Sequence, residues 1–249
     1  MAAPAAAARA STRISITWSD APPIEDTDTL VLTIDGYSLD MRVFVSGPGK
    51  GEIDWSTVAR VDELEGSTAA NPSLRWTHLI DSRPPSSLPD QGTFTTLPNG
   101  DVVEEGIMFN PKSSENEPYQ EVWRRLKQEP NAPYLVLEQI IDSHSDVSLR
   151  GEEEGGEEVE AEEEGVFLGR VGENALGIAK LKSESEHKFI AWRDRSEQGA
   201  WNRIYEFGEK ELVGQILPSL PAEIPSDWVK GETVDFGGKK WIVRTVGVL

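Results

Sequence analysis

The 249-residue chain contains no cysteine and only three histidines. Without cysteine, disulfides, thiol nucleophiles and cysteine-based metal sites are excluded. His78, His144 and His187 are far apart, and none has the spacing of a metal-ligand pair with another. We therefore expect neither a metal nor any other cofactor.

The sequence also has no apolar stretch of the roughly 20 residues that a transmembrane helix requires. Its first residues, MAAPAAAARASTR, lack the charged start and sustained apolar core of a secretory signal. Stable membrane insertion is therefore not expected. The absence of cysteine fits a reducing compartment, and we expect the protein in the cytoplasm and the nucleus.

Basic residues are scarce, since 24 lysines and arginines accompany 44 acidic residues and the formal charge is −20. A field of this sign repels nucleic acids and anionic membrane surfaces and attracts basic protein surfaces. Nucleic acid is therefore not an expected partner, whereas proteins with basic surfaces are.

Part of this charge is concentrated in an acidic run at residues 151–165, which contains no basic residue. Its nine glutamates are the candidate partner-binding residues: Glu152, Glu153, Glu154, Glu157, Glu158, Glu160, Glu162, Glu163 and Glu164. Like charges in a block repel one another and cannot bury apolar surface. The run is predicted to be a disordered insertion in the second half of the chain.

Elsewhere, apolar and polar residues alternate with the period of β-strands. Leu30, Leu32 and Ile34 form one such series. The alternation predicts strands with one set of side chains on a buried face and the other set toward water. Turn residues such as Asp35-Gly36 and Gly237-Gly238 separate the runs and predict hairpins. The stretch 212–225 contains three prolines and is predicted to be a loop.

These patterns divide the chain into a disordered tail at residues 1–12, a first domain at 13–128 and a second domain at 133–249. Two prolines lie in the predicted boundary. Each half ends with a strand, a tight turn and a strand in which a tryptophan is flanked by valine and arginine. The prediction is an all-β protein of two similar antiparallel β-barrel domains with few or no long helices.

The sequence contains no recognisable catalytic pattern. Residues 143–146 read Ser-His-Ser-Asp, but a catalytic triad needs its members to converge from separate elements. Small barrels can enclose one apolar ligand, and tryptophans are suited to line such a cavity or simply to fill the barrel interior. The candidates for cavity lining are Trp18, Trp55, Trp76, Trp192, Trp201 and Trp241.

Several stretches resemble, in their order along the chain, the fungal Hri family, named for interaction with a casein kinase 1 homologue. They are Thr27–Leu32, Leu39–Arg42, Asp54 and Trp55, Leu97–Asp101, Glu105 and Gly106, Pro118 and Tyr119, Glu121–Trp123, and Gly169 and Arg170. The resemblance implies two related lipocalin-like barrels and a non-enzymatic protein of cytosol and nucleus. It also implies two partners, the kinase and a component of the endoplasmic-reticulum translocation machinery.

Three hypotheses follow for the function. The first is a non-enzymatic interaction or adaptor protein, for which the acidic run and the resemblance argue. The second is a lipocalin-like carrier of a small apolar ligand. The third is an enzyme with carboxylates that converge at a barrel mouth.

Overall fold

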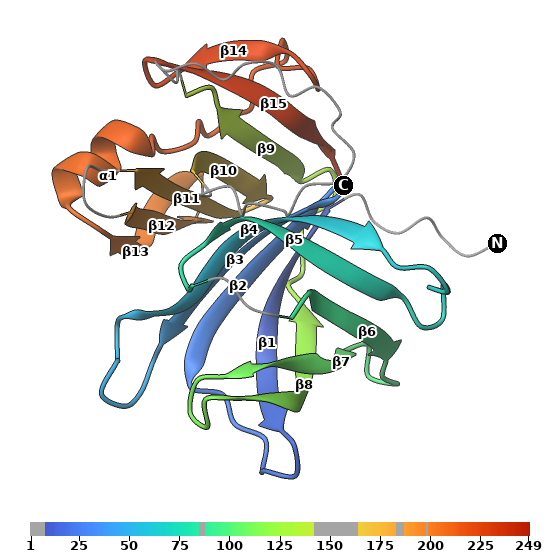
Figure 1. Ribbon diagram of the computed structural model, residues 1–249. Coiled ribbons are helices and arrows are strands. Elements are labelled where there is room, and N and C mark those ends of the chain that lie inside the picture. Colours follow the sequence, from blue (N-terminus) through green and yellow to red (C-terminus); the bar gives the residue numbers. More distant parts are fainter. Residues whose placement is uncertain (1–7, 85–87, 142–163, 183–186, 198) are drawn as a thin grey trace, which may run out of the picture.

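The computed structural model describes residues 8–84, 88–141, 164–182, 187–197 and 199–249. These residues form fifteen strands and one short helix, α1. The first eight strands close into an antiparallel barrel, and the other seven form a second sheet that lies against it (Figure 1). The prediction of an all-β protein built on an antiparallel barrel is confirmed. The one helix found in this part of the chain is too short to cross a membrane.

The barrel has the simple up-and-down order in which each strand pairs with the next. It is closed by pairing between the first and the eighth strand. Its strands are β1 (Ala8–Trp18), β2 (Thr27–Ile34), β3 (Tyr37–Phe44), β4 (Ile53–Glu63), β5 (Ser73–Asp81), β6 (Asp90–Thr96), β7 (Val102–Asn110) and β8 (Glu115–Arg125). Asp35 and Gly36 both have positive φ, at 44° and 81°, as the predicted tight hairpin between β2 and β3 requires.

The second half of the chain forms a seven-stranded sheet of order β13-β12-β11-β10-β9-β15-β14. Its strands are β9 (Pro133–Gln139), β10 (Gly165–Val171), β11 (Asn174–Lys182), β12 (His187–Glu197), β13 (Ala200–Phe207), β14 (Thr233–Phe236) and β15 (Lys239–Val248). The second expected barrel is therefore an open sheet in the described residues. Its edge strands β13 and β14 do not pair with each other, and the chain between them packs across one face of the sheet.

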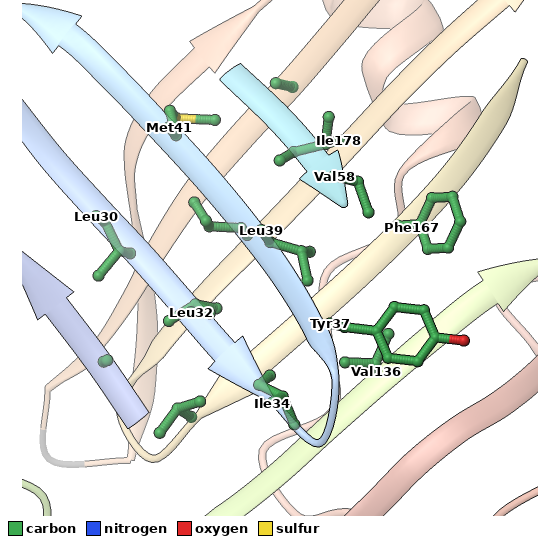
Figure 2. Packing of buried hydrophobic residues seen from close by; sticks show 14 of the residues in the cluster. Leu30, Leu32, Ile34, Tyr37, Leu39, Met41, Val58, Val136, Phe167 and Ile178 are labelled. Carbon is green, nitrogen blue, oxygen red and sulfur yellow. The ribbon is translucent and has the colours of Figure 1, made fainter. Parts of the chain in front are cut away.

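The outer face of the barrel packs against one face of this sheet and forms a shared core, the seam core (Figure 2). Leu32 and Leu39 enter it from the barrel, and Val136 and Ile178 enter it from the sheet. All four side chains are fully buried. Gly169 on β10 lets the two layers approach closely, since a Cβ there would lie 2.8 Å from Leu39. The two halves thus share one apolar core.

The opposite face of the sheet carries a second core that contains Trp192 and Trp241. Helix α1 (Lys210–Ile216) and the segment after it cover this face with Val213, Leu217 and Trp228 among other residues. The stretch 212–225, predicted to be a loop, therefore begins as a helix. Its prolines all come after the helix ends, where they cannot disturb it.

Two further differences from the predictions concern the barrel strands. β1 begins at Ala8, inside the expected tail, because Ala8 and Ala10 are buried in the seam core. β4 was not predicted, since its apolar residues do not keep a period of two. Asp54 is an extra residue of β4 in its pairing with β3, where Arg42 pairs with Trp55 and Val43 with Ile53, and it interrupts the alternation there.

Candidate functional site in the barrel interior

On β3, which the second sheet covers, the polar residues of the alternation face the barrel interior. Asp40 and Arg42 on β3 are each only 7% exposed. Arg42 reaches Glu121 on β8, although β1 and β2 lie between these strands, so the contact crosses the interior. The expectation that the polar set faces water was wrong here. The second sheet covers the apolar outer face of these strands, and the polar set fills the barrel.

Glu121 is the centre of this buried ionic network. Its Oε1 accepts hydrogen bonds from Arg13 Nη1 at 2.5 Å and from Arg42 Nη1 at 2.9 Å. Arg13 also pairs with Glu25 at 2.8 Å, and Arg42 with Asp40 at 2.8 Å. Burial alone would lower the pKa of both arginines, but the neighbouring carboxylates outweigh it and raise these pKa values above the ordinary one. Both guanidinium groups are therefore charged inside the barrel.

Glu104 on β7 forms the adjoining part of the network. It accepts hydrogen bonds from Tyr119 Oη at 2.7 Å and from Trp123 Nε1 at 2.9 Å. Gly92 on β6 leaves the space for it, because a Cβ there would lie 2.8 Å from the Glu104 side chain. Burial and, next, the charge of Glu121 raise the pKa of Glu104 to about 8. Glu104 is therefore protonated at neutral pH, which keeps a second negative charge away from Glu121.

Glu104→Gln is expected to stabilise the protein more at high pH than at low pH. Because the pKa is raised from 4.5 to about 8 in the fold, the folded state holds a proton that the unfolded state releases. Wild-type stability therefore falls as pH rises between these two values, and the non-ionising glutamine removes this fall, which is on the order of a few kcal/mol. Urea unfolding of both proteins at about pH 5 and about pH 9 measures it.

Any change in the free energy of unfolding that the new amide causes equally at both pH values cancels when the two values are compared. Glu105→Gln is the matched control, because Glu105 is the next residue on β7 and is exposed. It should show no such pH dependence. An equal effect of Glu104→Gln at both pH values would contradict the assigned protonation.

Aromatic and charged side chains fill the rest of the interior. The guanidinium of Arg42 lies 4.8 Å and that of Arg83 4.7 Å from the centre of the Trp55 ring. Trp55 Nε1 donates to Asp81 at 2.8 Å. His78 contacts Asp81 at 2.7 Å through Nδ1 and Asp90 at 2.9 Å through Nε2. Burial opposes the charge of His78, but both hydrogen bonds outweigh it and raise its pKa to about 10.

This arrangement limits what the interior can bind. An apolar ligand would have to displace hydrogen-bonded charges and leave them without partners, which is strongly unfavourable. One buried oxygen, Asp40 Oδ1, has no hydrogen-bond partner among the described residues, and burial raises the pKa of this carboxyl. Among the same residues no cluster of three or more acidic or histidine side chains could hold a metal ion.

The structure distributes the six candidate tryptophans over several places. Trp192 and Trp241 fill the second core, and Trp201 packs at its periphery, so these three line no barrel cavity. Apolar burial in a sheet core explains their position. The other three belong to the barrel: Trp55 lies between two arginines, Trp18 contacts Tyr119, and Trp76 contacts Phe94.

Most of the acidic run, from Glu152 to Glu163, lies outside the described residues, as do residues 143–146. Glu164, directly before β10, is exposed. The partner-binding role of the run therefore stays a prediction.

Sequence reasoning missed the ionic network of Arg13, Arg42, Glu104 and Glu121. The alternation of β3 contained a signal, because a strand that is buried on both faces can carry charges only in pairs. Asp40 and Arg42 are such a pair, two residues apart on one face. Their partner on β8 is far away in the sequence, and only the barrel closure brings it near.

Comparisons with known proteins found one matching family and one similar solved structure. The sequence profile of the family described as Protein HRI1 matches residues 9–244. The crystal structure of the uncharacterized protein YLR301w from Saccharomyces cerevisiae is similar, with a TM-score of 0.71 and 17% identity over 96% of this chain and 99% of that chain. No curated protein is matched by sequence. Since the profile covers almost the whole chain, the protein belongs to the HRI1 family.

Proposed function

We propose that this protein is a non-enzymatic adaptor that binds other proteins through its surface. The observation that carries the proposal is the barrel interior, which the network around Glu121 fills with the protein's own charges. A carrier of apolar ligands needs an apolar cavity, and buried charges such as those of Arg13, Arg42 and Glu121 are unsuited to line one. The outer surfaces are then the part of the molecule available for binding.

The charge of the chain supports a particular kind of partner. A protein with a net charge of −20 and nine glutamates in one run attracts basic surfaces. The family resemblance adds two candidates, a casein kinase 1 homologue and a component of the endoplasmic-reticulum translocation machinery. A protein of cytoplasm and nucleus would meet both of them.

Deletion of residues 152–164 is expected to weaken binding to a basic partner and to leave the fold nearly unchanged. Shortening the connection between β9 and β10 to this extent changes its closure entropy little, so the deletion should change stability by less than about 1 kcal/mol. Affinity for the purified kinase homologue and translocation component should be measured for both proteins at low and physiological salt. Attraction between charges predicts that the wild-type affinity falls with salt more steeply than that of the deletion variant.

A matched control replaces the nine glutamates by glutamines at unchanged length. If this variant binds as the wild type does, charge is not the basis of recognition. If neither candidate binds the intact protein, the two proposed partners are wrong.

A further inference from the structure

A surface groove of about 450 Å³ lies on the barrel along β5, β6 and β7. Leu64, Leu88, Pro89 and Ile107 give it an apolar lining, with Glu65 and Glu105 beside them. Figure 1 shows β6 and β7 on the part of the barrel remote from the second sheet. The groove is therefore not part of the seam core that joins the two halves.

The apolar surface continues from the groove along β7. Ile107 is 56% exposed, and Phe109, two residues further on the same face of the strand, is 46% exposed. Pro118 on β8 lies opposite Ile107 and is also exposed. Single exposed apolar residues are ordinary, but a row of them beside a groove is typical of a binding surface.

The charges around the groove indicate the chemistry of its occupant. Glu65 and Glu105 are both exposed, and Gln120 holds the Glu105 carboxylate with a hydrogen bond of 3.0 Å. None of the described residues that line the groove is basic. In a chain of net charge −20, such a surface attracts a segment that combines positive charge with apolar side chains.

We infer that this groove, together with Ile107 and Phe109, is the docking surface for a partner segment in which lysine or arginine residues stand next to apolar ones. The apolar side chains of the segment cover Ile107 and Phe109, and its cations contact Glu65 and Glu105. The inference rests on the proposed adaptor function, because it assigns that function a surface among the described residues.

The test uses two fluorescent peptides on the full chain, one of alternating leucine and lysine and one of alternating leucine and glutamate. Anisotropy should show binding of the basic peptide and much weaker binding of the acidic one. Ile107→Ser and Phe109→Ser should each lower the affinity for the basic peptide about tenfold, since a buried apolar contact is lost. In methyl NMR spectra, the Ile107 resonance should shift during the titration.

Val229→Ser is the matched control, because Val229 is 54% exposed and lies in the second half of the chain. It should leave the affinity unchanged within about twofold. Circular dichroism establishes that each variant is folded. Glu105→Gln should lower the affinity for the basic peptide less than Ile107→Ser does, and it should reduce the salt dependence of binding.

Any one of several results would overturn the inference. The first is equal affinity of the wild type for the two peptides, or equal affinity of the basic peptide for the wild type and for Ile107→Ser. The second is self-association of the wild type in sedimentation that Ile107→Ser abolishes, since the occupant would then be a second copy. A partner that is lost on deletion of residues 152–164 but retained by Ile107→Ser would refute the groove and leave the proposed function standing.

Discussion

Replacement of Glu121 by alanine is expected to lower the free energy of unfolding by about 3–5 kcal/mol. Glu121 is 2% exposed and accepts hydrogen bonds from both Arg13 and Arg42. Its removal leaves two buried guanidinium groups with one carboxylate partner less. Two buried cations in one network then repel each other, in addition to the loss of both hydrogen bonds.

Chemical denaturation followed by tryptophan fluorescence measures this effect, because Trp55 and Trp123 both lie beside Arg42. Glu115→Ala is the matched control on the same strand, since Glu115 is exposed, and it should change stability by less than about 0.5 kcal/mol. Glu121→Gln should lie between the two, because the amide oxygen still accepts one hydrogen bond. A loss below about 1 kcal/mol for Glu121→Ala would show that the network is hydrated and not closed.

The strands could be predicted from the sequence wherever apolar residues on one face alternate with polar residues on the other. Leu30, Leu32 and Ile34 have the period of two, and a hairpin at Asp35-Gly36 after them was predicted. These features depend on neighbours in the sequence, which is why local patterns were sufficient.

The candidate site could not be predicted in the same way, because it depends on closure. Period-two alternation shows that two faces differ, but it does not show which of them meets solvent. On β3 neither does, since Leu39 faces the second sheet and Asp40 faces the barrel interior. The pairing of β1 with β8 brings Arg13 within reach of Glu121, 108 residues later in the chain. No pattern of neighbouring residues in the sequence predicts that contact.

Leu39→Ala is expected to lower the free energy of unfolding by about 2–5 kcal/mol through a single transition of the whole chain. Leu39 is fully buried in the seam core, and it packs against Gly169 of the second sheet. Truncation removes apolar contacts and leaves a cavity between two sheets that cannot close on it easily. Because barrel and sheet both contribute to this core, the loss destabilises both halves.

The two halves contain separate optical reporters, which makes the shared core testable. Trp55 reports on the barrel interior and Trp192 on the second core. Leu39→Ala should lower the free energy of unfolding by the same amount in a version that retains Trp55 but lacks Trp192 and in one that retains Trp192 but lacks Trp55, each compared with the same version without Leu39→Ala. Val45→Ala, at a position 44% exposed just after β3, is the control and should cost less than about 1 kcal/mol.

If only the Trp55 reporter shifts, the barrel unfolds independently of the sheet. The seam core would then be an interface between two separately stable domains, and each half should fold when it is expressed alone. If both reporters shift together, neither half can bury the apolar face that it presents to the other, and the protein is one cooperative unit despite its two sheets.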